Sequence, residues 1–190
     1  GMSRRNVLDT YMILGGVPYY WKFLQREYSW AQNIDALFFQ ESSPLQNEFN
    51  ALYASLFRNP QPYIDIIKAL GSKKVGMTRA EIILATKLNL GGQLTTILEE
   101  LEQCDFIRSF HALGKNKKEM TYQLIDNFTL FYFQFMANYT RTSAYWSQKI
   151  NQPQFNTWSG FAYERVCMQH IEQIKQAIGI SGIASSVYSW

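Results

Sequence analysis

Apolar side chains recur along the first third of the chain at the three- and four-residue spacing of amphipathic helices. Ser29 and Ser43 each precede such a pattern, and a serine hydroxyl can accept the first hydrogen bond of a helix. Glycine and proline pairs interrupt the pattern between helices. We therefore predict a helical bundle over residues 1–58. Its helices are expected over 6–14, over 19–24, from Trp30 to Phe38, and from Ser43-Pro44 to a stop at Asn59-Pro60.

The next segment continues with helical signals. Pro62 can occupy the first turn of a helix that Gly71 ends. Thr78 and Glu81 have the three-residue separation of a capping box, in which each side chain bonds to the backbone of the other residue. A short helix is therefore expected from Thr78 to about Lys87.

A further helix is expected over 91–103, and after it the spacing of apolar residues changes from that of a helix to that of a strand. Its apolar side chains fall on one face: Leu94, Ile97, Leu98 and Leu101. Segments 106–110 and 120–124 instead alternate like strands, and a lysine-rich loop joins them. The predicted order of elements is helix, helix, turn, helix and then a hairpin with a basic tip. This order is typical of a winged helix-turn-helix, which we predict over residues 59–125.

The last third begins with an aromatic helix. Asp126 can cap it, and residues 128–135 are apolar nearly all round, so we expect this helix to be buried between two layers. Another helix is expected from Phe161 to about Ile171, and residues 184–190 alternate like a strand. Residues 126–190 are therefore predicted to lead into an α/β domain that is truncated at the end of the chain.

The composition provides enough apolar residues for a sizeable core and gives little net charge. Apolar residues make up 47% of the chain, so disorder is not expected. The net charge of +3 is too small to indicate a nucleic-acid partner, and any basic surface must come from local clustering. No signal peptide or membrane-spanning apolar run is present in the sequence, so we expect a cytoplasmic protein without a membrane partner.

Cysteine and histidine give no sign of a metal site. Cys104 and Cys167 lack metal-ligand spacing and occupy apolar helical patterns, so both are expected to be structural and buried. His111 and His170 lie far apart in the sequence, and each is expected to be an ordinary surface or partly buried imidazole.

Several segments, in this order, resemble one protein family. The segments are 14–20, 33–39, 45–57, 78–124, 126–132 and 158–164. Together they resemble the region that follows the nucleotide-binding core in archaeal and Bacteroides-type AAA ATPases, which are related to the signal-transduction ATPases with numerous domains. The resemblance implies a mainly α fold: a helical lid-like bundle, a winged helix, and the start of a nuclease-like domain of the PD-(D/E)XK kind.

The resemblance also implies roles for two residues of the lid. Gly16 and Pro18 match the Gly-x-Pro whose proline packs on the adenine of ATP, a role that requires a nucleotide core. No phosphate-binding G-x-x-x-x-G-K-[ST] motif occurs in the sequence. We therefore expect no cofactor in this chain, and no ATP hydrolysis.

Glu164 matches the helical glutamate of the nuclease-like domain. Metal-dependent phosphodiester cleavage needs several converging carboxylates, and the other family positions would lie beyond Trp190. We therefore expect Glu164 to face solvent, and we expect neither a metal site nor catalytic residues. The sequence predicts a non-catalytic region of an ATPase.

The helix over 91–103 would enter the major groove if the winged helix binds double-stranded DNA. Its outward residues Gln93, Thr95 and Thr96 could then contact bases or phosphates. Further basic residues favour DNA through counterion release. These are the hairpin lysines Lys115, Lys117 and Lys118, together with Lys73, Lys74, Arg79, Lys87 and Arg108.

Three acidic residues of the same helix, Glu99, Glu100 and Glu102, oppose contact with phosphate unless that end points away from the duplex. The alternative is a module for protein interaction or self-association, with an ATPase core or another protein as its partner. Both functions remain open at this point, because a fold alone does not determine function.

Overall fold

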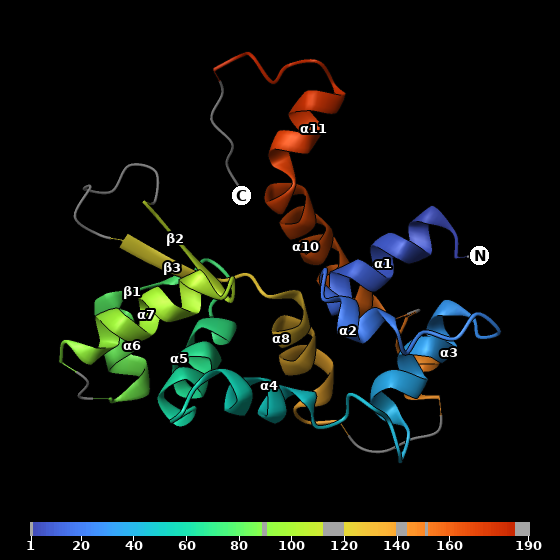
Figure 1. Ribbon diagram of the computed structural model, residues 1–190, viewed down its shortest axis with the longest axis horizontal. Coiled ribbons are helices and arrows are strands. Elements are labelled where there is room, and N and C mark those ends of the chain that lie inside the picture. The colour runs from blue at the N-terminus through green and yellow to red at the C-terminus, as the bar shows by residue number, and fades with distance from the viewer. Residues whose placement is uncertain (1, 89–90, 112–119, 140–143, 151, 185–190) are drawn as a thin grey trace. The chain divides into compact units, whose positions relative to one another are not determined.

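The computed structural model describes residues 2–88, 91–111, 120–139, 144–150 and 152–184. These residues are mainly helical and include a three-stranded antiparallel sheet (Figure 1). They divide into two compact units, which we call unit 1 (Gly1–Phe39 and Arg141–Trp190) and unit 2 (Gln40–Thr140). The boundaries predicted after residues 58 and 125 both fall inside unit 2, because residues 49 and 53, before the first boundary, pack against residues 132 and 129, after the second.

Unit 1 is built from helices at both ends of the sequence. They are α1 (Arg4–Leu14), α2 (Pro18–Trp21), α3 (Trp30–Ile34), the π-helical turn η1 (Asp35–Phe39), α9 (Tyr145–Lys149), α10 (Pro153–Gln169) and α11 (Ile171–Ala177). Ser29 caps α3 as predicted, by accepting a hydrogen bond from the backbone N–H of Gln32. In the ribbon view, α11 follows α10 after a short break at His170 (Figure 1).

The helix expected from Phe161 is longer than predicted. It begins at Pro153, because a proline at the first helical position gives up no intrahelical hydrogen bond there. The strand expected over residues 184–190 lies almost wholly outside the described residues, and Ala184 itself has no regular structure.

A buried carboxylate joins the two sequence halves of unit 1. Asp35 Oδ1 accepts a hydrogen bond of 2.7 Å from the backbone N–H of Trp146. Asp35 Oδ2 accepts bonds of 3.2 and 2.7 Å from the backbone N–H and the hydroxyl of Ser147. Asp35 therefore satisfies two N–H groups in the first turn of α9, and a carboxylate there favours the positive end of that helix.

Aromatic rings surround this carboxylate cap. The Trp146 indole is fully buried and lies edge-on to Trp30, Phe155 and Trp158. Its ring also stacks with Phe39, at an interplanar angle of 10°. Such aromatic contacts add to the hydrophobic burial, so the cap and the ring cluster together hold α9 against α3 and η1.

Unit 2 contains the sheet and the helices around it. Its elements are α4 (Glu48–Leu56), α5 (Gln61–Ser72), β1 (Met77–Thr78), α6 (Arg79–Thr86), α7 (Gln93–Gln103), β2 (Ile107–His111), β3 (Met120–Leu124), α8 (Asn127–Phe131) and the π-helical turn η2 (Tyr132–Met136). The strand order is β1-β3-β2, with Met77 opposite Tyr122 and Ser109 opposite Tyr122 on the other side.

Several local signals in unit 2 act as predicted. Thr78 and Glu81 form the capping box of α6, and the Asp126 carboxylate caps α8 by accepting a bond from Thr129 N–H at 2.7 Å. The two expected strands are present as β2 and β3. The apolar face expected for α7 is buried: Leu94, Ile97, Leu98 and Leu101.

Other expectations for unit 2 were wrong in detail. The fourth helix begins at Glu48 and not at Ser43-Pro44, because the Ser43 hydroxyl accepts a bond from Gln40 N–H and the next residues form turns. Leu56 has the helical spacing of the apolar face of this helix, with Phe49 and Tyr53, but it is 48% exposed. The aromatic helix changes to a π-helical turn after Phe131, and it is not buried all round, since Gln134 is exposed.

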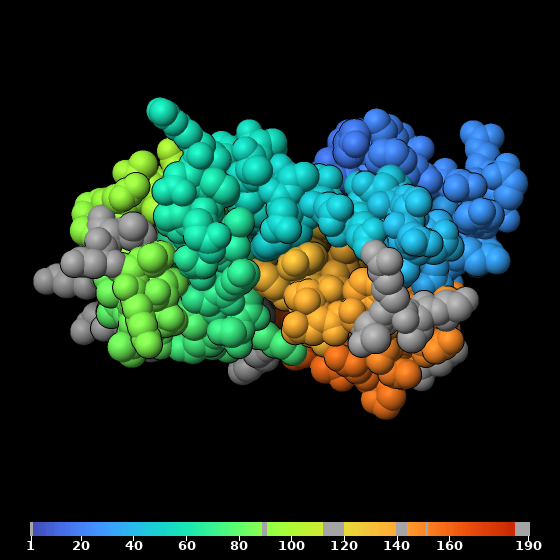
Figure 2. Space-filling view, turned by 90° about the horizontal axis from the view of Figure 1, so that it is seen from below, coloured from blue at the N-terminus to red at the C-terminus, as the bar shows by residue number. Residues whose placement is uncertain are grey.

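The aromatic segment packs against α4 and α5. Phe49 of α4 stacks on Tyr132 with ring centroids 4.0 Å apart, and Tyr53 shares a buried hydrogen bond of 3.2 Å with Thr129. The gold surface of α8 and η2 lies directly against the blue-green surface of α4 and α5 (Figure 2). This packing fixes the helices that support the sheet and α7.

Candidate nucleic-acid interface

The N-terminal half of α7 presents polar side chains to solvent. Gln93, Thr95 and Thr96 are all exposed, while Leu94 and Ile97 between and after them are buried. All three residues predicted to face DNA are therefore exposed, but Gln93 lies seven positions before Glu100 and so shares with it the side of α7 that faces α5. Hydroxyl and amide groups of this kind can bond to both bases and phosphates.

The acidic residues of α7 point mainly into unit 2. Glu100 accepts a hydrogen bond from the Tyr63 hydroxyl of α5. Glu102 Oε1 accepts bonds of 2.7 Å from both the backbone N–H and the hydroxyl of Ser109 in β2. Glu99 is the exposed member of the group. Repulsion of phosphate by this helix is therefore smaller than the sequence suggested.

Arg79 connects the start of α6 to the start of α7. Its Nη1 donates a 2.7 Å hydrogen bond to the Thr95 hydroxyl, and its Nη2 donates a 3.1 Å bond to the Gly91 carbonyl. Gly91 has a positive φ of 50°, which glycine adopts without strain. Arg79 thus fixes the turn before α7, a role that no local sequence signal indicated.

Other basic residues also have partners inside unit 2. Lys73 Nζ lies 2.5 Å from Glu81 Oε1. The hydrogen bond from Lys73, followed by those from the Thr78 backbone and hydroxyl, lowers the pKa of Glu81 to about 2. Arg108 Nη2 donates a 2.8 Å bond to Gln123 Oε1. Together with the hydrogen bonds of Arg79, these two pairings reduce the cationic surface available to a nucleic acid.

The remaining predicted cations differ in how far the structure describes them. Lys87 is exposed and ends α6 in the left-handed conformation, with φ of 55°. The carbonyl of Lys74 accepts a 2.7 Å bond from Gln123 Nε2. Lys115, Lys117 and Lys118 lie outside the described residues. The basic hairpin tip therefore stays a prediction.

Gly16 and Pro18 lie in unit 1, at the corner between α1 and α2. Both are exposed, and Pro18 is the first residue of α2. The turn itself is made by Gly15, which has φ of 63° and whose carbonyl accepts a 2.9 Å bond from the Trp21 indole. Lys22 Nζ sits 4.0 Å from the centre of the exposed Tyr19 ring. The corner thus presents a proline and an aromatic ring at the surface of unit 1.

The two cysteines differ from expectation. Cys104 is exposed at the C-terminal end of α7, so the expectation that it is buried was wrong, while Cys167 is half-buried. Desolvation, followed by the charges of Glu100 and Asp105, raises the pKa of the Cys104 thiol. Fewer thiolates at neutral pH make this cysteine a weak nucleophile.

Glu164 and His170 lie in and after α10. Glu164 is half-buried and not fully solvent-facing. His170 Nε2 lies 3.1 Å from the Tyr11 hydroxyl of α1, and its imidazole is half-buried. Among the described residues, no three His, Cys, Asp or Glu side chains are grouped closely enough to hold a metal ion. Nor does any helix in the described part of the chain have the length and apolar character needed to cross a membrane.

Comparisons of the chain with models of known families, with curated proteins and with solved structures found no match.

Proposed function

We propose that this chain is the C-terminal region of an AAA-family ATPase of the archaeal and Bacteroides type. In this proposal its α5–β3 part is a winged helix-turn-helix that contacts double-stranded DNA without catalysing a reaction. The ordered sequence segments that resemble this family support the proposed membership. In this proposal Gly16 and Pro18 would contact adenine only beside a nucleotide core.

The order and pairing of elements in unit 2 support the winged helix. Helix α5 is followed by β1, then by α6 and α7, and then by β2 and β3. The short first strand pairs with the last one, which gives the order β1-β3-β2. A helix-turn-helix backed by a three-stranded sheet of this order is typical of winged helix domains. This topology is the observation that carries the proposal.

The outward face of α7 supports DNA as the partner. Gln93 and Thr96 are exposed in the first turn of a helix, where unpaired N–H groups attract phosphate. Glu100 and Glu102 are held by Tyr63 and Ser109, so they do not form a free acidic row beside the duplex. The internal pairing of Arg79 and Lys73 means that few cations remain for phosphate. Binding should therefore be weak and tolerant of sequence.

Placing a carboxylate on this face tests the proposal. Thr96→Glu should weaken binding of a fluorescent mixed-sequence duplex by roughly tenfold at low salt, because the new charge would face phosphate. The matched control is Gln134→Glu, which adds the same charge at an exposed position of η2. Affinity is measured by fluorescence anisotropy. Equal losses of affinity in both variants would show that α7 is not the contact surface.

A second candidate is a protein-interaction module. The observation that favours it is the exposed aliphatic surface of α6, where Leu84 is 79% and Ile83 44% exposed. Exposed apolar groups of this kind can form part of a protein interface. If the chain fails to bind DNA even at low salt, and a Leu84→Glu variant alters its association with a co-encoded ATPase core, this second function replaces the first.

A further inference from the structure

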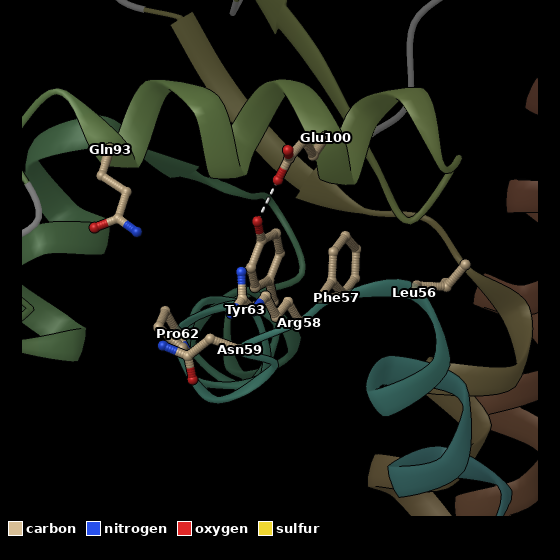
Figure 3. A pocket seen from close by; sticks show the side chains of 8 residues that line it. All are labelled: Leu56, Phe57, Arg58, Asn59, Pro62, Tyr63, Gln93 and Glu100. Carbon is tan, nitrogen blue, oxygen red and sulfur yellow. Dashed lines mark hydrogen bonds between the residues drawn. The ribbon is translucent and has the colours of Figure 1, made fainter.

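A cavity of about 280 Å³ opens between the start of α5 and the inner side of α7 in unit 2 (Figure 3). Its size is at the lower end of small-molecule sites, so it suits a ligand of few atoms. One wall is a pair of parallel rings, Phe57 and Tyr63, with centroids 3.8 Å apart and an angle of 12° between them. The lining residues are Leu56, Phe57, Arg58, Asn59, Pro62, Tyr63, Gln93 and Glu100.

The fixed charge of this cavity is negative. Glu100 is half-buried, and its Oε2 accepts the hydrogen bond of the Tyr63 hydroxyl, shown as a dashed line in Figure 3. Among the described residues, the Tyr63 hydroxyl donates a hydrogen bond to this carboxylate, whose two oxygens can accept further bonds. The carboxylate is held in place by a ring that is itself stacked on Phe57.

The Tyr63–Glu100 pair also resists losing its proton. Desolvation, then the hydrogen bond and the charge of Glu100, raise the pKa of Tyr63 to about 12. Tyr63 therefore remains a neutral donor at any physiological pH, and Glu100 is the acidic residue of the lining. Arg58 carries the opposing positive charge, but it is exposed, and a solvated arginine can swing away at low cost.

We propose that this cavity binds a guanidinium group. A guanidinium offers a planar fork of donors that matches a carboxylate, and its flat face packs against aromatic rings. The amide oxygens of Asn59 and Gln93 supply further acceptors on the lining. The group can come from a free small guanidine or from an arginine side chain of a partner. The site shares Gln93 with the proposed contact with DNA, whereas Glu100, which carries this proposal, takes no part in that contact.

The probe is methylguanidine, and methylurea is its neutral control of nearly the same shape. Binding to the full chain is followed by NMR shifts of the Tyr63 ring and the Glu100 amide at constant ionic strength. Methylguanidine should shift these signals in a saturable way and methylurea should not. Equal binding of the two compounds, or no saturable shift with methylguanidine, would overturn the proposal.

Two variants with opposite expected effects sharpen the test. Glu100→Gln keeps an oxygen for the Tyr63 hydroxyl but removes the charge, and should weaken methylguanidine binding by about tenfold or more. Arg58→Ala changes an exposed side chain and should strengthen binding by about threefold, because a like charge is lost. Glu99→Gln, on the same helix but outside the lining, should change nothing.

If Glu100→Gln and Glu99→Gln have the same effect, the cavity is not the binding site. If Glu100→Gln fails to fold by circular dichroism, Arg58→Ala decides alone, and weaker or unchanged binding rejects the proposal. A tripeptide with one central arginine identifies the source of the group. Tighter binding than methylguanidine indicates an arginine side chain, and equal or weaker binding indicates a free guanidine.

Discussion

Gly76 stands between α5 and β1 in a conformation that other residues rarely adopt. Its φ is 85°, and a Cβ added there would lie 2.6 Å from the carbonyl oxygen of Tyr122 in β3. Gly76→Ala should therefore lower the free energy of unfolding of unit 2 by roughly 1–3 kcal/mol, since both the backbone and the β1-β3 pairing are strained. Urea unfolding followed by far-UV circular dichroism measures the change.

The control for this substitution is Gly92→Ala. Gly92 has φ of −65°, and nothing lies within 4 Å of its ideal Cβ. Its replacement should change stability by less than about 0.5 kcal/mol. A Gly76→Ala protein as stable as Gly92→Ala would show that β1 does not approach β3 as closely as described.

Glu81 gives unit 2 an acid-sensitive contact. Its pKa is about 2 when folded and near the ordinary 4.5 when unfolded, because Lys73 and Thr78 bond to the ionised carboxylate. A lowered folded pKa contributes stability that is fully present above pH 4.5 and is lost as the pH falls toward 2. The stability difference between the natural chain and Glu81→Gln should therefore shrink from pH 5 to pH 3. A difference that stays constant over this range would show that the pKa is not lowered.

At the scale of elements, the cap of α9 is the contact most open to a test. Asp35→Ala removes the acceptor of three hydrogen bonds at the N-terminus of that helix. Loss of a cap costs about 0.5–2 kcal/mol, and burial of the freed N–H groups places this one toward the upper end. Unit 1 should therefore unfold at lower urea concentration.

Tryptophan fluorescence can follow this effect separately. The tryptophans at positions 21, 30, 146, 158 and 190 all fall in the sequence ranges of unit 1, and unit 2 contains none. The fluorescence transition of Asp35→Ala should move to lower urea concentration. The part of the far-UV circular dichroism transition that Gly76→Ala changes, which reports on unit 2, should stay in place. Asp126→Ala, which uncaps α8 in unit 2, is the matched variant and should leave the fluorescence transition unchanged. The reverse pattern would contradict the assignment of Asp35 to α9.

Elements with a complete local signal could be predicted from the sequence. Ser29, Thr78 and Asp126 each cap the helix expected to follow it, because capping depends on residues only three positions apart. The strands β2 and β3 follow from alternation within five residues. These features need no knowledge of distant contacts.

Elements that depend on distant contacts could not be predicted. β1 has two residues and exists because Met77 and Thr78 pair with β3 more than forty positions away. The helix α9 was missed because its cap, Asp35, lies 111 positions before Trp146. The two π-helical turns lie in aromatic segments, and no short-range sequence signature predicts a π-helical turn there.

The candidate interface was predictable only in part. Exposure of Gln93, Thr95 and Thr96 follows from helical periodicity, because the apolar residues of α7 fix the opposite face. The partners of Arg79 and Glu100 come from other elements, α7 and α5, so spacing along the chain could not indicate that these charges are engaged.

For the whole molecule, the proposed function is contact with double-stranded DNA through α7 and the lysines between β2 and β3. The most direct measurement is the slope of log affinity against log salt concentration, for the natural chain and for a variant with Lys115, Lys117 and Lys118 replaced by alanine. Each lost phosphate contact reduces the slope by about 0.9, so the proposed contact predicts a slope smaller by roughly two to three units. An unchanged slope, or no binding of the natural chain even at low salt, would contradict it.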